Sequence, residues 1–374
     1  MSSAKLDIND ILVKSGLADF TRNIRLGEFE RSYDVAKKTV IIMNNLVKEN
    51  PWPRARDLMD TLKEVCAYID SLGLVETAAA NMTRRIMRII RDECQNFNAL
   101  QRDSQDDTLE SNRDETNDTN LDLELQQTGV KENILEGIEQ ELMNELELSS
   151  KSIARQAIDY VQSEENILTL GKSKVIESFL RHAANGSKTG KRKFNVIVVE
   201  LAPFYSGREM AKSLNKSGIS TLIIPDSAVF AIMSRVNKVI IGCHSMMANG
   251  GIKAPAGSHS VALAAKHFSV PLIVCCPMYK LTPEYLVSHD SAAFKQFSNL
   301  HAAFPEPYTP AASRDTPAPS QGTFRGTTVE SLHSTFDYVP PELITLFVSN
   351  IGGNSPSYVY QLLNELYYKS DYLD

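Results

Sequence analysis

Six residues between positions 225 and 267 have the types and spacing of a small-ligand pocket. They are Asp226, Ser227, Asn249, Gly250, Ser258 and His259. The first pair follows one expected strand, the second pair follows the next strand, and the third pair opens a helix. A carboxylate in such a place can act as an acid or base, and the first amides of a helix attract anions. The pattern is typical of a sugar-phosphate pocket where strand ends converge.

The same residues also fit a purely structural interpretation. Asp226 and Ser258 are of the types preferred at helix N-caps, and the glycines of Asn249–Gly251 suit a turn. Helix caps are commoner than ligand sites. The sequence alone therefore leaves both interpretations open.

Three other motifs do not support a cofactor. Thr169–Ser173 (TLGKS) resembles a phosphate-binding loop, but Asn166 stands where that motif requires glycine. No GxGxxG follows the first expected strand, so no dinucleotide is predicted. Cys275 and Cys276 lack the second cysteine pair of a zinc site, and we expect them to pack in the core. We predict neither a cofactor nor a metal.

After residue 162, short apolar runs alternate with helical stretches. The expected strands are Ile167–Leu170, Val196–Val199, Thr221–Ile224, Val239–Ile241, Leu272–Cys275 and Ile344–Val348. The expected helices are Lys174–Ala184, Arg208–Ser217, Ser227–Arg235, Ser258–His267 and Ser355–Tyr367. Strands that are apolar throughout and alternate with helices form parallel sheets covered on both faces. We predict a Rossmann-like, doubly wound α/β domain over residues 163–374.

Residues 1–162 are predicted to form an all-helical domain. Asp57–Leu74, Ala78–Cys94 and Glu132–Val161 carry apolar residues every three or four positions. Residues 101–128 are polar and acidic, which predicts a disordered insertion, because such a segment buries too little apolar surface to fold. An acidic docking segment is the alternative. A second mobile loop, rich in Pro, Ser and Thr, is expected at 304–334, since it is too long for an ordinary α/β connection.

The distribution of charge limits the possible partners. The chain of 374 residues has a net charge of −7, and residues 101–128 alone hold nine acids and two bases. The remaining acids and bases therefore balance, and a neutral body lacks the positive field that binds nucleic acid. No apolar run is long enough for a membrane helix, no secretory signal is visible, and five cysteines form no disulfide framework. We predict a cytosolic protein that binds neither nucleic acid nor membrane directly.

Five further segments resemble a known family. They are Val199–Gly207 (VELAPFYSG), Arg235–Gly242 (RVNKVIIG), Leu263–His267 (LAAKH), Phe336–Ile344 (FDYVPPELI) and Asn350–Asn354 (NIGGN). The family contains the alpha, beta and delta regulatory subunits of eukaryotic translation initiation factor 2B and the sugar-phosphate aldose–ketose isomerases. The segments look most like the beta-type members. The resemblance covers residues 163–374 and extends into the helical part.

The resemblance implies that the catalytic groups of the isomerases are missing. Those enzymes use a cysteine after the first α/β strand and an aspartate after a later one. The aspartate matches Asp226, but the cysteine position is Gly171. A family arginine is replaced by Ala202, an aspartate by His244 and a lysine by Pro255. One positioned acid or base contributes about 10²–10⁴-fold to a rate, so we expect negligible isomerase activity.

The resemblance implies a regulatory, non-catalytic subunit of the guanine-nucleotide exchange factor complex for translation initiation factor 2. Such a subunit would pair with delta through its α/β domain and assemble with the alpha, gamma and epsilon subunits. It would help to recognise the alpha subunit of factor 2 and its phosphorylation state, while another subunit carries the exchange activity. A sugar-phosphate isomerase, and a module that senses nucleotides or sugar phosphates, are the alternatives.

Overall fold

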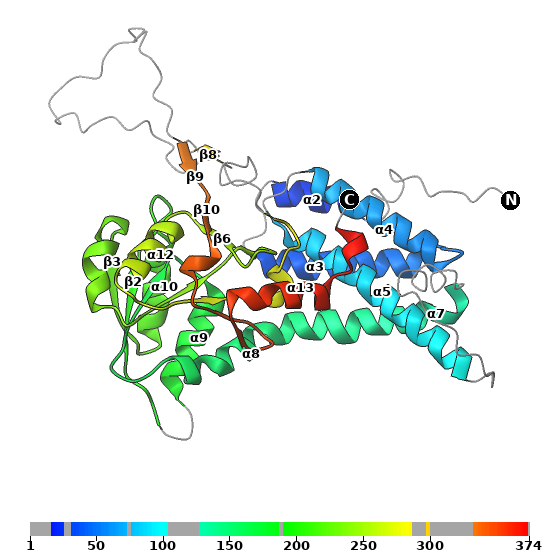
Figure 1. Cartoon of the computed structure of the whole chain (residues 1–374). Helices are drawn as coiled ribbons and strands as arrows, with labels where there is room; N and C mark the ends of the chain where they lie inside the picture. The colour runs from blue at the N-terminus through cyan, green and yellow to red at the C-terminus, as the bar shows by residue number, and fades with distance from the viewer. Residues whose placement is uncertain are drawn as a thin grey trace, which may run out of the picture.

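The computed structural model describes residues 16–25, 31–72, 76–103, 127–186, 190–285, 297–299 and 332–372. They form an elongated molecule with a helical half at one end and an α/β half at the other (Figure 1). Most of the predicted insertion at 101–128 and of the predicted loop at 304–334 lies outside the described residues. The described flanks of these two segments belong to helices that end at Asp103 and begin at Gln127, and to a strand at Leu332–Ser334.

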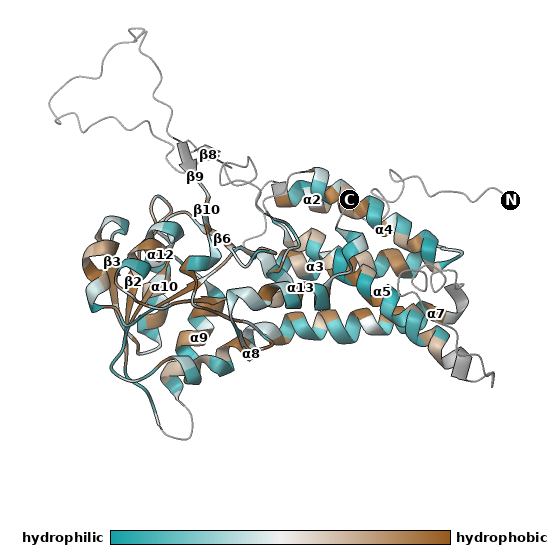
Figure 2. Cartoon of the chain, in the orientation of Figure 1, coloured by the Kyte–Doolittle hydropathy of each residue, from teal (hydrophilic) through white to brown (hydrophobic). Residues whose placement is uncertain are grey.

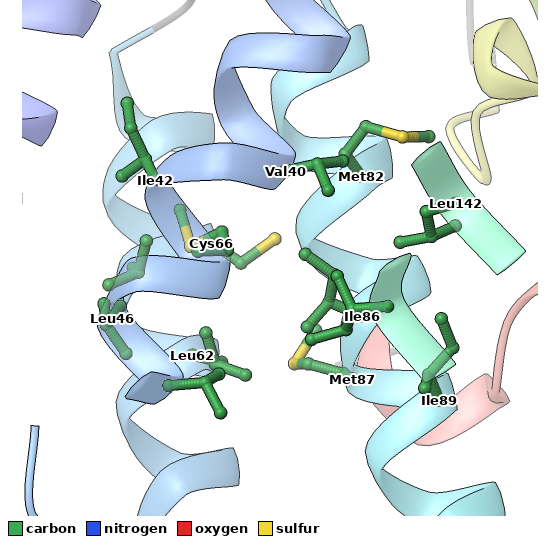
Figure 3. Packing of buried hydrophobic residues seen from close by; sticks show 14 of the residues in the cluster. Val40, Ile42, Leu46, Leu62, Cys66, Met82, Ile86, Met87, Ile89 and Leu142 are labelled. Atoms are coloured by element: carbon green, nitrogen blue, oxygen red, sulfur yellow. The ribbon is translucent and has the colours of Figure 1, made fainter. Parts of the chain in front are cut away.

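Among the residues that the structure describes, seven helical segments make up the helical half. They are α2 (Leu17–Arg25), α3 (Ser32–Glu49), α4 (Ala55–Ser71), α5 (Ala78–Asp103), α7 (Gln127–Gly137), the π-helical η2 (Ile138–Met143) and α8 (Asn144–Tyr160). The predicted apolar stripes form one core, in which Leu46 of α3, Leu62 of α4 and Ile86 of α5 are buried (Figure 3). Trp52 is buried in the same core and donates its indole N–H to the Val47 carbonyl over 3.2 Å.

The helix predicted at Glu132–Val161 is longer and less regular in the structure. It begins at Gln127, and its middle section, η2, has the wider π-helical turn. α8 continues below both halves and packs on α9 (Lys174–Asn185) at its far end (Figure 1). This long element therefore connects the helical half to the sheet.

In the described part of the α/β half, seven strands form the central sheet. They are β1 (Asn166–Leu170), β2 (Asn195–Val199), β3 (Ser220–Ile224), β4 (Lys238–Gly242), β7 (Leu272–Cys275), β11 (Leu346–Val348) and β12 (Gly353–Asn354). Their order is β12-β11-β7-β4-β1-β2-β3, and every pair is parallel except β11 with β12. The chain order reverses between β1 and β4, as in a doubly wound fold. The predicted fold class is confirmed.

Alternate residues of each strand point to opposite faces of the sheet, and helices cover both faces. Ile167 of β1 packs in a core with α8, α9 and α10 (Ser206–Lys216), whereas Leu168 packs with α11 (Val229–Ile232), α12 (Ser258–His267) and α13 (Val359–Leu366). Apolar residues colour most of the strands brown in Figure 2. The core of the α/β half thus lies on both sides of the sheet.

The regular helix predicted at Ser227–Arg235 is wrong. The structure has three short pieces there: the 3₁₀ turns η3 (Asp226–Ala228) and η4 (Met233–Arg235), with the four-residue α11 between them. This connection has to carry the chain from the edge strand β3 past two strands to β4. With so few residues available, the chain forms tight turns instead of a regular helix.

A second, antiparallel sheet lies beside α12 and was not expected from the sequence. Its strands are β5 (Ser245–Met246), β6 (Ile252–Pro255) and β10 (Phe336–Val339), in the order β10-β6-β5. β8 (Phe297–Asn299) and β9 (Leu332–Ser334) form a separate antiparallel pair. Such short strands, paired with partners far along the chain, leave no periodic signal in the sequence.

The C-terminal segment returns to the helical half and packs on α5. The Arg91 guanidinium forms an ion pair with Asp371 in η9 (Lys369–Asp371), and the two side chains are 7% and 1% exposed. The Tyr368 hydroxyl donates to Asp92 over 2.9 Å. Residues almost three hundred positions apart therefore stabilise one another.

Candidate functional site

Four loops follow adjacent strands at the carboxyl edge of the sheet, the edge at which open α/β sheets bind ligands. Gly171 follows β1, Ala202 follows β2, Asp226 follows β3 and His244 follows β4. The strands are neighbours in the order β3-β2-β1-β4. These are the positions at which the resemblance placed the reactive groups of the isomerases.

The backbone at Gly171 is shaped for glycine. Its φ is +60°, a left-handed conformation that side-chain-bearing residues rarely adopt. A Cβ atom at this position would lie 2.8 Å from Cδ2 of Leu201 and 3.2 Å from Oγ of Ser206. A nucleophilic cysteine at this place would thus be strained by the backbone and crowded by its neighbours.

Asp226 binds the neighbouring loop. Its Oδ2 accepts the backbone N–H of Ala202 over 2.8 Å, and the carboxylate is half-buried. The expectation that Asp226 is an N-cap is wrong, because it is the first residue of η3 and its carboxylate bonds across to the β2 loop. Ser227 is exposed. The carboxylate thus fixes the loop in which Ala202 replaces the family's arginine.

Asn249 and Gly250 form a tight turn. Oδ1 of Asn249 accepts the Gly251 N–H over 2.9 Å, and its Nδ2 donates to the Tyr338 hydroxyl over 2.8 Å. Gly250 has a φ of +81°, and a Cβ there would lie 2.6 Å from the Pro356 carbonyl oxygen. The geometry supports the structural interpretation of this pair.

A carboxylate of the chain itself occupies the N-terminus of α12. Oδ2 of Asp337, on β10, accepts the Gly257 N–H over 2.6 Å and the His259 N–H over 3.3 Å. Ser258 is buried, and its hydroxyl donates to the Pro255 carbonyl over 2.6 Å. The N-cap is Gly257, so the expectation that Ser258 caps the helix is wrong. The anion at this helix end is Asp337, which the sequence analysis did not identify.

The six predicted pocket residues thus divide into two groups. Asp226 and Ser227 lie at the β3 edge and are tied to the β2 loop. The turn at Asn249 and the start of α12 at His259 are both tied to β10. The motif FDYVPPELI was visible in the sequence, but nothing in it showed that its aspartate and tyrosine bind these two loops.

Replacing Asp337 by alanine should loosen the start of α12. Loss of a helix-capping acceptor costs about 1 kcal/mol, which corresponds to roughly fivefold faster opening. We expect amides in the first turn of α12 to exchange with deuterium faster by about this factor. Asp337→Asn keeps one acceptor oxygen and should have a smaller effect. Equal protection in the wild type and Asp337→Ala would show that the carboxylate contributes nothing.

His244 connects the two halves of the molecule. Its Nε2 lies 3.3 Å from Oε1 of Glu76, which also accepts the Ser32 hydroxyl over 3.1 Å. The imidazole ring lies 4.5 Å from the ring of Phe336. Burial lowers the pKa of Lys253, whose ammonium lies 5.0 Å from the same ring. The residue that replaces a family aspartate therefore contributes to an interdomain contact.

Within the described ranges, no three His, Cys, Asp or Glu side chains are grouped so that they could hold a metal ion. None of the helices in this part of the chain combines the length and apolarity of a membrane span.

A comparison with protein-family models shows to which family the chain belongs. The model of the initiation factor 2 subunit family matches residues 29–356. The chain belongs to this family. The resemblance noted in the sequence is therefore confirmed, and the match extends over both halves of the fold.

Two relatives and one solved structure show which members of the family this chain resembles. Beta subunits of translation initiation factor eIF2B are 36% identical in Dictyostelium discoideum, over 92% of both chains, and 30% identical in Schizosaccharomyces pombe, over 99% of both chains. A chain of the tetrameric eIF2B beta2-delta2 complex from Chaetomium thermophilum has a TM-score of 0.67 at 22% identity, over 95% of both chains. Delta and alpha subunits are similar over about two thirds of this chain.

Proposed function

We propose that this chain is a beta-type regulatory subunit of the exchange factor that recharges translation initiation factor 2 with GTP. The observation that carries the proposal is the similarity to beta subunits along 92% or more of both chains. The similarity to delta and alpha subunits covers less of the chain, which favours the beta type.

In this proposal the chain is not the catalytic subunit, and the exchange activity belongs to another subunit. The carboxyl edge of the sheet speaks against isomerase activity, because the backbone at Gly171 is shaped for glycine. Ala202 offers no charged side chain, and His244 pairs with Glu76 of the helical half. With these three positions unsuited to acid–base chemistry, the remaining function lies in surfaces that contact other proteins.

One exposed apolar face fits a partner subunit. It consists of Phe204, Leu222, Phe230 and Leu263, each between 53% and 56% exposed. These residues come from the β2 loop, the edge strand β3, α11 and α12. Large apolar side chains that are left exposed near one another are typical of protein interfaces. We assign the delta subunit to this face, since the similar chain of the solved complex is assembled with delta.

The other partners follow from membership of the same complex. We propose that the chain also assembles with the alpha, gamma and epsilon subunits in the cytosol. Together with them it would help to bind the alpha subunit of factor 2 and to distinguish its phosphorylated form. We propose no direct contact with nucleic acid or a membrane.

The predicted pocket residues remain a secondary proposal. Asp226, Ser227, Asn249, Gly250, Ser258 and His259 would be what is left of a sugar-phosphate pocket. The intramolecular bonds of Asp226, Asn249 and Ser258 favour a structural role over ligand binding. Calorimetry of the full chain with nucleotides and sugar phosphates distinguishes the two, since any saturable heat would revive the sensing module.

A reconstitution experiment tests the proposed function. We expect the pure chain to release no GDP from factor 2 and to turn over neither methylthioribose phosphate nor ribose bisphosphate. Exchange factor assembled without this chain should lose its response to phosphorylated factor 2, and adding the chain during assembly should restore it. Isomerase turnover by the pure chain, or an unchanged response without it, would overturn the proposal.

A further inference from the structure

Two cysteines lie side by side at the ends of two central strands. β4 and β7 are parallel neighbours, and their last paired residues are Gly242 and Cys275. One step further along both strands come Cys243 and Cys276. Adjacent strands lie about 4.8 Å apart, and disulfides join cysteines whose Cα atoms are about 4.4–6.8 Å apart. The strand register therefore places this pair within bonding reach.

The side chains of this pair point to the same face of the sheet. Cys243 and Cys276 belong to the same apolar cluster, beneath α11 and α12. The Cys276 thiol itself donates to the Pro277 carbonyl oxygen over 3.6 Å. Cys275 belongs to the core on the opposite face. All five cysteines are free thiols in the structure. Of the adjacent residues Cys275 and Cys276, Cys276 alone can reach Cys243.

The surroundings make the two thiols chemically unequal. The ammonium of Lys280 lies against Cys243 and donates to its carbonyl oxygen over 2.8 Å. Burial opposes ionisation of Cys243, but the neighbouring Cys276 and the charge of Lys280 outweigh it and lower the pKa of Cys243. Burial and the neighbouring Cys243 raise the pKa of Cys276 well above its ordinary value. A thiol that ionises more readily beside one that ionises less readily is the arrangement of redox-active pairs.

We propose that Cys243 and Cys276 form a reversible disulfide when the protein meets a hydroperoxide. In the first step the sulfur of Cys243 attacks a peroxide oxygen, so that an S–O bond forms and the O–O bond breaks. Water leaves with the proton of Cys243, and a sulfenic acid remains. In the second step the sulfur of Cys276 attacks this sulfenic sulfur, and the S–O bond breaks. A second water leaves with the proton of Cys276.

The balance of this reaction is two thiols oxidised and one hydrogen peroxide reduced to two waters. Cys243 is the entry point, because it retains 5% exposure at the carboxyl edge whereas Cys276 has none. A thiol reductant reverses the reaction by thiol–disulfide exchange. The disulfide would join the end of β4, just before His244, to the end of β7, just before the loop that contains Met278. It does not depend on the proposed exchange-factor role.

Mass spectrometry of the full-length chain tests the proposal. After hydrogen peroxide and alkylation, trypsin should yield peptide 239–253 joined to peptide 267–280, with a mass two hydrogen atoms below their sum. Adding dithiothreitol before alkylation should remove the joined species. We expect it in the wild type and in Cys275→Ala, and at background level in Cys243→Ala and Cys276→Ala.

Cys275→Ala is the matched control. It removes a thiol that lies in the same tryptic peptide as Cys276 but points to the opposite face of the sheet. Thermal unfolding of each variant checks that the fold is kept. If an alanine variant does not fold, alkylation of the native wild-type protein tests the proposal instead. Peroxide treatment should then make Cys243 and Cys276 resistant to alkylation together. A joined species lost in Cys275→Ala, or peroxide-treated wild type that keeps both thiols free, would overturn the proposal.

Discussion

Replacing Phe230 and Leu263 by aspartate should separate this chain from the delta subunit. Both side chains are more than half exposed, so the substitutions leave the fold of the chain intact. In the assembled pair they would place two unpaired carboxylates in an apolar interface. Truncating a single hot-spot residue costs about 2 kcal/mol or more, and burying unpaired charge adds to this. We expect the affinity for delta to fall by at least about a thousandfold, or roughly 4 kcal/mol.

Co-purification and sedimentation measure this loss. Tagged chain co-expressed with delta should retain it in the wild type and lose it in the double variant. Leu148→Asp is the control, because Leu148 on α8 of the helical half is 50% exposed and lies outside the apolar face. The wild-type chain prepared without delta should self-associate in light scattering, because its apolar face is then uncovered. Full retention of delta by the double variant would place the interface elsewhere.

Removing the carboxylate of Asp371 should release the C-terminal segment from α5. The partner of this carboxylate, Arg91, lies 2.5 Å away, and both side chains are almost fully buried. Breaking a buried ion pair by removing one partner costs about 3–5 kcal/mol, because the other charge stays buried and uncompensated. In Asp371→Ala we expect the opening of residues 359–372 to become more frequent by roughly two orders of magnitude or more.

Hydrogen exchange of the chain in its complex with delta measures this opening. Peptides from α13 and η9 should lose protection in Asp371→Ala, while peptides from β1 and β2 keep theirs. The double variant Arg91→Met with Asp371→Leu replaces the pair by apolar groups of similar size and should recover most of the protection. If Asp371→Ala is as well protected as the wild type, the ion pair does not hold the segment.

The regular part of the fold could be predicted from the sequence because its signal is local. β1, β2, β4 and β7 are built mainly of apolar residues, and their limits lie within one residue of those expected. α4 and α5 follow the apolar spacing of three and four. The antiparallel strands β6 and β10 could not be predicted, since they pair Ile252 with Val339, far apart in the chain.

The candidate site was harder to predict because its contacts are long-range. The sequence showed that Gly171 and His244 lack the family's reactive groups, but it gave no sign that His244 pairs with Glu76. It showed a helix starting at Ser258 but not that Asp337 supplies the anion at that end. Residue types and spacing indicate which groups are available, whereas the pairing of each group depends on folded geometry.

The pairing of Arg91 with Asp371 has a consequence for how the protein is made. The two residues are separated by 280 positions, so the arginine is synthesised long before its counter-ion. At about 5–20 residues per second, the ribosome needs roughly 15–55 s to cover that distance. During this time the Arg91 guanidinium of the nascent helical half has not yet met the carboxylate with which it pairs. The final packing of this half has to wait until Asp371 has been made, and chaperones have that interval in which to bind it.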